Sequence, residues 1–472
     1  MSVLEFTEKQ IYISFVYLVS IALFIIGIKS LSSAKTARKG NTFSAAAMLI
    51  AIIAALFEKD ILNPGWIITG IAIGGIIGVF FAYKVQMTEM PEMVALFNGF
   101  GGGASTLVAT SALVSLATTG TGTLDITEGV IIAASIVIGT FTFTGSIIAY
   151  GKLQGKISSQ PIIFPGQRIV NALMFIAMFT AIAFVIKEPT QWNYLYVTLF
   201  FAAILGMTLV IPIGGADMPV VISLLNSYSG LAAAATGFVL NNYVLIVAGS
   251  LVGASGVILT KIMCEAMNRS LANVLFGAFS AGSTIGKAGD FEKRSVKSYS
   301  IEDAIIQLES ANSVVFVPGY GLAVAQAQHT VQELAEILQA RGVEVRYAIH
   351  PVAGRMPGHM NVLLAEASVD YELQIEMDDI NPEFENTDVT IVVGANDVIN
   401  PAARDDEASP IYGMPILEVD KSNTTIVIKR SLSPGFAGID NDLFYQDNTM
   451  MIFGDAKKVL VNMVTQAKNE LS

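Results

Sequence analysis

The sequence predicts a polytopic α-helical membrane bundle followed by a soluble α/β domain with a doubly wound parallel sheet. Its 472 residues are 53% hydrophobic and only 14% charged, whereas a soluble globular protein has about 25% charged residues. Apolar residues dominate up to about Ala288 and charges cluster beyond it, so the two regions require different solvents. Beyond this change, short apolar runs alternate with helical patterns. We therefore expect a transmembrane domain at 1–286, a linker at 287–303 and a soluble domain at 304–472.

About nine segments approach the 20 or so apolar residues that a spanning helix requires. The first lacks the basic start and the small-residue cleavage site of a signal peptide, so it is predicted to be a membrane helix. The predicted spans are 11–28, 43–57, 66–83, 93–118, 129–150, 169–186, 192–211, 218–240 and 243–263.

Lysine and arginine residues gather in the odd-numbered loops between these spans. Loops rich in lysine and arginine usually face the cytoplasm. The even-numbered loops are poorer, because their Lys59 and Lys187 stand beside acidic residues. We therefore expect the N-terminus outside and the soluble domain in the cytoplasm of a multi-pass protein of the inner (plasma) membrane. The cations that support this orientation are Lys29, Lys35, Arg38, Lys39, Lys84, Lys152, Lys156 and Arg168, with Arg269, Lys287, Lys293, Arg294 and Lys297 after the last span.

Polar and small residues interrupt several spans. The fourth contains Asn98 and a run of glycines at 99–103, and the eighth contains Asn226. Glycine and serine allow helices to pack closely, but a buried amide needs a partner or water. The amides therefore either bridge helices or line a pathway. The three histidines all lie beyond residue 320, so a titrating relay in the membrane must use water, a group from another subunit, or one of Glu92, Asp217 and Glu265.

Composition also excludes several classes of partner and site. The net charge of −12 gives no indication of nucleic-acid binding. The single cysteine, Cys264, excludes an internal disulfide and a cysteine-based metal site, and it is predicted to be a buried helix residue. We expect no metal.

The soluble region begins with a dinucleotide-binding pattern. An apolar strand at 313–317 is followed by Gly319-x-Gly321-x-x-Val324, a helix through Gln339 and a second strand at 343–349. This strand–turn–helix–strand context is typical of a Rossmann-like nucleotide site. The first glycine permits the tight turn, and the second is expected to let a pyrophosphate approach the helix N-terminus.

The strand ends favour NADP over NAD. An NAD site usually has Asp or Glu at the end of the second strand, but here that strand ends at His350 with no acid following. A later strand at 424–428 ends in Lys429-Arg430-Ser431, which suits a 2′-phosphate, although these residues could also be a solvated basic pair. Further strands are predicted at 388–393, 415–419 and 449–453, giving six in all.

Seven motifs resemble those of one family, the β subunits of proton-translocating NAD(P)+ transhydrogenases, and the resemblance covers essentially the whole chain. They are MTEMPE at 87–92, GGADMP at 214–219, LNSYSG at 225–230, PGYGL at 318–322, HPVAGRMPG at 350–358, GAND at 394–397 and KRS at 429–431.

The resemblance implies a set of nucleotide-contacting positions and a proton path. The proton path would involve Asn98, Asp217 and Asn226, and Asp397 would be tied to coupling. Together with the fingerprint residues, the expected NADP(H)-binding positions are Gly319, Tyr320, Gly321, Val324, Val352, Ala353, Gly354, Arg355, Met356, Pro357, Gly394, Ala395, Asn396, Asp397, Val398, Gly413, Met414, Lys429, Arg430, Ser431, Leu432, Ser433, Pro434, Gly435, Phe436, Asp455 and Ala456.

The resemblance also implies direct hydride transfer between NAD(H) and NADP(H) coupled to proton translocation, with no catalytic side chain. The chain has one dinucleotide fingerprint, so NAD(H) is expected on one or more α subunits, in a lipid-embedded dimer of α–β units. Two positions depart from some relatives, which have histidine at Asn98 and tyrosine at Phe436. The alternative function is a secondary transporter gated by a nucleotide-sensing domain; a membrane dehydrogenase with its own substrate is disfavoured, because no substrate domain is evident.

Overall fold

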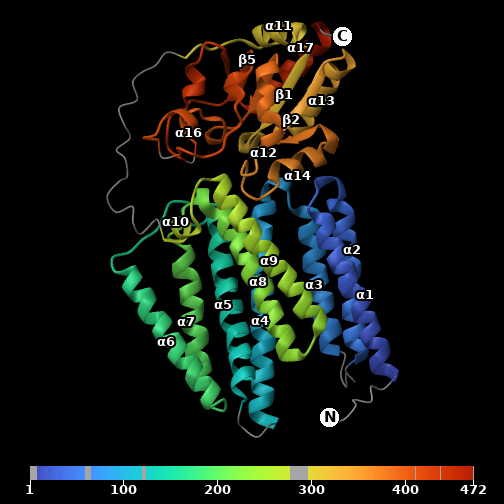
Figure 1. Cartoon of the computed structure of the whole chain (residues 1–472), viewed down its shortest axis with the longest axis vertical. Coiled ribbons are helices and arrows are strands. Elements are labelled where there is room, and N and C mark those ends of the chain that lie inside the picture. The colour runs from blue at the N-terminus through green and yellow to red at the C-terminus, as the bar shows by residue number, and fades with distance from the viewer. Residues whose placement is uncertain are drawn as a thin grey trace. The chain divides into compact units, whose positions relative to one another are not determined.

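The computed structural model describes residues 8–58, 65–119, 124–276, 296–409, 411–435 and 437–470 (Figure 1). The chain forms two compact units, one made of 1–213 with 221–259 and the other of 214–220 with 260–472. The predicted start of the linker, at 287–295, lies outside the described residues.

Within the described residues, nine helices are long and apolar enough to cross a membrane, as the sequence predicts. Their order along the chain is visible in Figure 1, from the blue N-terminal helices to the yellow-green α9. They are α1 (Glu8–Leu31), α2 (Ala34–Glu58), α3 (Gly65–Lys84), α4 (Met90–Thr119), α5 (Ile126–Leu153), α6 (Gln167–Lys187), α7 (Trp192–Val210), α8 (Met218–Leu240) and α9 (Tyr243–Ala266).

Most of the cations that were assigned to the odd-numbered loops lie on the ends of helices, among them Lys29, Lys84 and Arg168. Helix α2 starts at Ala34, well before the expected residue 43, so Lys35 and Arg38 lie on its first turns. Lys152 lies in the last turn of α5 with only 1% of its surface exposed. The sequence pattern located the apolar stretch of each span, but polar first and last turns extend a helix beyond that stretch.

Glycines set the contact between α4 and α5. A Cβ on Gly102 would lie 2.6 Å from the carbonyl oxygen of Gly139, and a Cβ on Gly139 would lie 2.5 Å from that of Gly102. A Cβ on Gly99 would meet Ser146, and one on Gly103 would meet the ring of Phe143. Helix α5 of the same chain therefore covers Gly99, Gly102 and Gly103 of α4.

Helices α8 and α9 pack in the same way, with serines added. A Cβ on Gly230 would come within 2.5 Å of the backbone nitrogen of Gly253. Ser227 Oγ donates to the carbonyl of Gly253 at 2.7 Å, and Ser223 Oγ donates to that of Gly256 at 3.2 Å. Small residues thus allow close approach while their hydroxyls are satisfied by backbone acceptors.

The second unit contains a six-stranded, all-parallel sheet in the order β3-β2-β1-β4-β5-β6. Its strands are β1 (Ser313–Pro318), β2 (Glu344–Ile349), β3 (Gln374–Glu376), β4 (Val389–Val393), β5 (Thr424–Lys429) and β6 (Thr449–Phe453). The chain order reverses between β1 and β4, so the predicted doubly wound architecture is confirmed. Such a reversal opens a crevice at the carboxyl ends of the strands.

One predicted strand and one predicted helix of this unit are wrong. Residues 415–419 form no strand, because their backbone groups bind elsewhere. Leu417 N donates to Val398 O, Glu418 N donates to Asn381 Oδ1, and Ile416 O accepts from Asn381 Nδ2. The sixth strand is instead β3, whose three residues are too short to give a pattern. The helix predicted through Gln339 is also divided, into α12 (Tyr320–Ala325) and α13 (Gln328–Ala340), because Gln326 adopts a left-handed conformation with φ of 49°.

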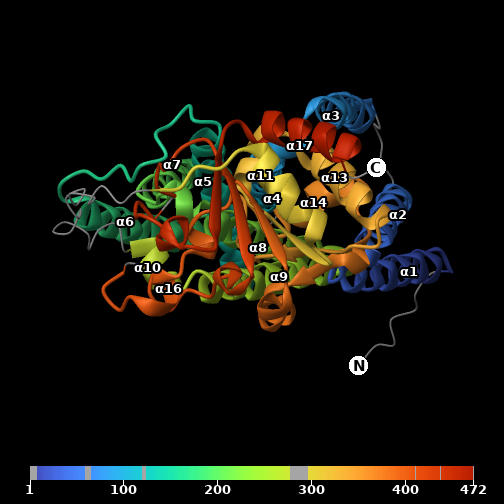
Figure 2. The same cartoon turned by 90° about the horizontal axis from the view of Figure 1, so that it is seen from above.

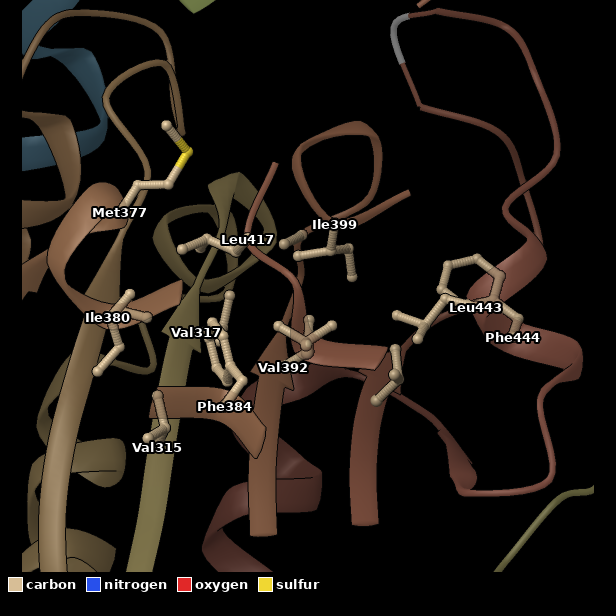
Figure 3. Close-up of a cluster of buried hydrophobic side chains, with 14 of the residues drawn as sticks. Val315, Val317, Met377, Ile380, Phe384, Val392, Ile399, Leu417, Leu443 and Phe444 are labelled. Carbon is tan, nitrogen blue, oxygen red and sulfur yellow. The ribbon is translucent and has the colours of Figure 1, made fainter. Parts of the chain in front are cut away.

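Long helices and short ones cover opposite faces of the sheet. Helices α11 (Ile301–Ser310), α13 and α17 (Ala456–Glu470) lie together on one face (Figure 2). On the other face, Phe384 and Ile380 from α15 (Met377–Ile380) and η5 (Asn381–Asn386) pack with Val317 and Val392 of the strands (Figure 3). Strand β4 is buried at every residue, and apart from Thr390 its side chains are apolar, as is typical of a parallel strand covered on both faces.

The glycine contacts between α4 and α5 predict a position-specific effect on stability. We expect Gly139→Val to destabilise the chain by about 1–3 kcal/mol, because the new side chain must push the helices apart. The matched control is Gly74→Val on α3, where nothing lies within 4 Å. Thermal unfolding of the detergent-purified chain measures both variants, and equal melting temperatures would contradict the packing argument.

Candidate functional site

A cleft of about 490 Å³ opens at the carboxyl ends of the strands. The turns after β1, β2, β4, β5 and β6 all contribute to its lining. Of the predicted nucleotide positions, it brings together Gly319, Tyr320, Gly321, Val324, Val352, Ala353, Gly354, Gly394, Ala395, Asn396, Asp397, Val398, Lys429, Arg430, Ser431, Ser433, Pro434, Gly435, Asp455 and Ala456.

Other predicted positions lie behind this lining or outside the described residues. Met414 packs with a separate apolar cluster of Ala403, Ile411 and Ile416, and Gly413 precedes it. Phe436 is outside the described residues. Arg355, Met356, Pro357 and Leu432 do not line the cleft, whereas Ala325, Ile428 and Gly454 do and were not predicted. These three follow directly from the strand and helix ends, which the sequence pattern placed only approximately.

Two backbone turns cross at the centre of the cleft. A Cβ on Gly319 would strike the backbone of Ala395, and a Cβ on Gly321 would lie 2.6 Å from the Cα of Gly394. Gly321 N also donates to Gly394 O at 2.9 Å, and Gly394 has a positive φ of 67°. We expected the second glycine to make room for a pyrophosphate. In the structure its close neighbour is the turn after β4, and the approach of a pyrophosphate stays a prediction.

Two neutral histidines shape the wall after β2. His350 Nδ1 accepts from Val352 N at 3.2 Å, so the ring hydrogen lies on Nε2, which donates to Pro415 O at 2.9 Å. His359 Nδ1 likewise accepts from Arg355 N at 3.0 Å. Burial lowers the pKa of His350 to about 4. Burial, followed by the charge of Arg355, lowers the pKa of His359 to about 4. Each imidazole thus serves as an acceptor for a backbone N–H of the cleft wall.

Arg355 extends this wall over the turn after β1. Its guanidinium carbon lies 4.5 Å from the ring centroid of Tyr320, a cation–π distance. The Tyr320 ring is in turn 6.2 Å from that of His359. Gly354 has a positive φ of 109°, and a Cβ there would strike the His359 ring. The loop after β2 is therefore packed onto Tyr320, which lines the cleft.

Lys429 brings a cation to the end of β5. Its Nζ donates to Ser433 O at 2.6 Å and lies 4.7 Å from the Phe444 ring centroid. With the Asn396 amide turned so that its oxygen faces the lysine, that oxygen accepts from Lys429 Nζ at 2.9 Å and from Gly435 N at 2.7 Å. Burial lowers the pKa of Lys429 to about 8, while Asp397 and Asp440 oppose the shift. The site therefore holds a partly desolvated cation that an anionic ligand would stabilise.

Asp397 connects the turn after β4 to the loop after β5. Its Oδ2 accepts from Ala437 N at 2.9 Å, and a Cβ on Gly435 would strike the carboxylate. Any displacement of Gly435 or Ala437 must therefore alter the surroundings of this carboxylate. Among the described residues, no group of three or more His, Cys, Asp or Glu side chains is arranged to hold a metal ion.

The membrane positions Asn98, Asp217 and Asn226 lie at ordered points of the fold. Asn98 is buried, and its Nδ2 donates to Ile222 O at 3.2 Å, one helical turn before the half-buried Asn226 on α8. Asp217 accepts from Arg269 Nη1 at 2.6 and 2.7 Å through its two oxygens. The bridging alternative is thus realised for Asn98, and Asp217 has a cationic partner that the sequence did not reveal.

These features define a class: a multi-pass membrane protein with a Rossmann-like α/β domain and a polar cleft at the carboxyl ends of its strands. The model of the NAD(P) transhydrogenase beta subunit family matches residues 13–466. NAD(P) transhydrogenase subunit beta of Rhodospirillum rubrum is 50% identical over 461 residues, which cover 96% of this chain and 98% of that protein. A protein of the same name from a designated strain of that organism matches to the same extent. The chain belongs to the NAD(P) transhydrogenase beta subunit family.

The histidine geometry predicts acid-sensitive stability of the soluble domain. Because the folded pKa of His350 and of His359 is depressed from 6.5 to about 4, the unfolded chain binds more protons between these values. Stability is therefore complete above about pH 6.5 and falls as pH drops towards 4, by roughly 3 kcal/mol per histidine at about 1.4 kcal/mol per pH unit.

Urea unfolding of the segment 296–472 at pH 7.5 and pH 5 measures this loss. We expect His359→Gln to reduce the pH dependence, whereas His329→Gln, which changes an exposed histidine, should leave it unchanged. The same pH dependence in wild type and His359→Gln would show that protonation of this ring does not cause the loss of stability.

Proposed function

We propose that this chain is the membrane subunit of an enzyme that transfers hydride between NAD(H) and NADP(H) and couples that transfer to proton translocation. The observation that carries the proposal is the cleft itself. In a transhydrogenase β-subunit chain, it places a cation at the end of β5 and a neutral histidine at the end of β2. NADP(H), when bound, supplies hydride exchange, and this chain's residues bind and orient it.

The residues present fit NADP(H). Lys429, with Arg430 and Ser431, offers cations and a hydroxyl for a 2′-phosphate. His350, held neutral by its hydrogen bonds, stands where an NAD site usually has an acid. The 2′-phosphate end of the nucleotide therefore belongs over β5, and the rest of the molecule extends past the glycine crossing towards the wall after β2.

The chain's own contribution to the reaction is positioning. Hydride transfer between nicotinamide rings needs no protein acid, base or nucleophile. What it needs is a fixed geometry and the exclusion of water. The backbone crossing at Gly321 and Gly394 holds the two turns in place. The contact of Asp397 with Ala437 is the point at which the affinity for the nucleotide can change.

A second nucleotide site must come from another chain. The sequence has a single dinucleotide fingerprint, whereas the reaction uses two nicotinamide rings. We infer that NAD(H) is bound by one or more α subunits, in a dimer of α–β units embedded in lipid. The distribution of lysine and arginine favours an inner-membrane location with the nucleotide domain in the cytoplasm.

Proton movement across the membrane provides the free energy that the hydride transfer itself does not release. NAD+ and NADP+ have similar potentials, and a membrane potential supplies about 2.3 kcal/mol per charge per 100 mV. The proposed path passes Asp217, paired with Arg269, and the turn of α8 that Asn98 and Asn226 share. Neither amide titrates. Asn98 bridges α4 to α8, and the Asn226 amide is the one proposed to hold water. The titrating group is expected on a partner subunit.

The Lys429 geometry predicts nucleotide selectivity. The segment 296–472 should bind NADP(H) far more tightly than NAD(H), as measured by calorimetry. Lys429→Met should weaken NADP(H) by about 1.5–3 kcal/mol, the range for a hydrogen bond to a charged group, and should leave NAD(H) unchanged. Since the pKa of Lys429 is about 8, wild-type affinity should be greatest below pH 8 and should fall as pH rises above it.

The control for this experiment is Lys457→Met, which removes an exposed lysine from α17. Equal affinity of the wild-type segment for NADP(H) and NAD(H) would contradict the proposal that the end of β5 binds the 2′-phosphate.

Coupling can be tested in the reconstituted complex. The purified chain alone should transfer no hydride from NADH to NADP+, and activity should appear on adding the α subunits. Asn226→Leu should then abolish proton uptake into sealed vesicles while NADP(H) still binds. A complex that takes up protons without exchanging hydride would favour a nucleotide-gated transporter. Normal proton pumping by the Asn226→Leu variant would leave that amide a packing residue.

A further inference from the structure

Lys152 is a buried cation that neither the sequence nor the proposed chemistry accounts for. It lies in the last turn of α5 with 1% of its surface exposed. Lysine is almost never fully buried unless it is paired. Among the described residues, the recorded partners of its Nζ are two backbone carbonyls, Ile213 O at 2.8 Å and Gln160 O at 3.2 Å. Both partners are neutral. The free-energy cost of burying this charge is therefore not offset by an ion pair with either of them, and the ammonium must have another role.

The position of those carbonyls explains what the ammonium does locally. Ile213 ends the turn that follows α7, and Gln160 lies in the loop between α5 and α6. Backbone carbonyls removed from water require a donor, and one ammonium can donate to more than one acceptor. One ammonium therefore satisfies acceptors from two segments far apart in the sequence and ties them together.

Further contacts make this junction rigid on one side. Gln167 is buried, and its Nε2 donates to Thr208 O at 2.8 Å on α7. Ile162 N donates to Ile211 O at 3.4 Å, and Ser159 Oγ donates to Lys152 O at 3.4 Å. The α5–α6 loop is thus fastened to the end of α7 at several points, and Lys152 is the point nearest to the start of the next segment.

That next segment is the α7–α8 connector, defined here as residues 214–217, which carries Asp217. Its first two residues are glycines, which have no side chains to hold it in place. The carboxylate of Asp217, at the end of the connector, is paired with Arg269. Its start follows directly from Ile213, whose carbonyl Lys152 binds. The ammonium of Lys152 therefore fixes where the connector begins.

We propose that Lys152 is a positioning residue for proton coupling, and that its buried ammonium holds the α7–α8 connector so that Asp217 stays in place while the enzyme turns over. The inference rests on the proposed proton-coupled function. Methionine, which matches lysine in shape, would fill the space but leave the buried carbonyl of Ile213 without this donor. The connector would then be held at Asp217 and released at its start.

The test uses the complete complex with the variants Lys152→Met and Lys152→Arg and the control Lys156→Met. Lys156 is an exposed lysine four residues further along the chain, beyond the end of α5. In sealed vesicles, Lys152→Met should reduce the stimulation of hydride transfer by a proton gradient at least tenfold. Gradient-free transfer in detergent should stay within twofold of wild type. Lys152→Arg should restore most of the stimulation, and Lys156→Met should match wild type.

A second measurement is independent of activity. In a chain carrying Cys264→Ala and Gly214→Cys, the rate of maleimide labelling reports the mobility of the connector. Adding Lys152→Met should raise that rate at least fivefold, and adding Lys156→Met should leave it unchanged.

The outcomes separate this inference from the proposed function. Normal gradient stimulation in Lys152→Met overturns it, as does a parallel loss of gradient-free and gradient-driven transfer with unchanged labelling. A wild-type complex that shows no response to the gradient refutes the proposed function instead, and the labelling rates then decide the role of Lys152 alone.

Discussion

The crossing of two backbone turns at the switch point of the sheet determines the geometry of the cleft. The turn after β1 and the turn after β4 approach so closely that neither Gly321 nor Gly394 has room for a Cβ. This contact fixes the separation of the two halves of the sheet at their carboxyl ends. The walls after β2 and β5 are then placed relative to it, so Tyr320, Asn396 and Lys429 converge on one space.

Backbone carbonyls are the main partners of buried polar groups in the membrane helices. Asn98, Ser223, Ser227 and Lys152 all donate to carbonyls of a different helix or connector. Between packed membrane helices, such bonds satisfy the side chain and fix helix register at the same time. They explain how α8, which is rich in polar residues, can be one of the most buried spans.

The sequence predicted the nine spans and the parallel sheet, because long apolar runs and β-branched runs are strong signals. It misplaced features that depend on tertiary contacts. The run at 415–419 looks like a strand, but its backbone bonds go to Val398 and Asn381. Lys152 looks like a solvated loop charge, and only the fold shows that two carbonyls surround it. The cleft residues were predicted through motifs, whereas Arg269 as the partner of Asp217 was not, since nothing in their spacing indicates it.

The hydrogen bonds of the histidines also determine the chemical reactivity of the chain. In His350 and His359, the Nδ1 lone pair is occupied by a backbone N–H, and the remaining nitrogen carries the ring hydrogen. Both rings are buried, whereas His329 is exposed. An electrophile that acylates imidazoles therefore finds one nucleophilic ring on the folded chain, although the sequence contains three histidines. Loss of the wall after β2 would expose the other two, so the number of reactive imidazoles is a direct chemical readout of whether that wall is formed.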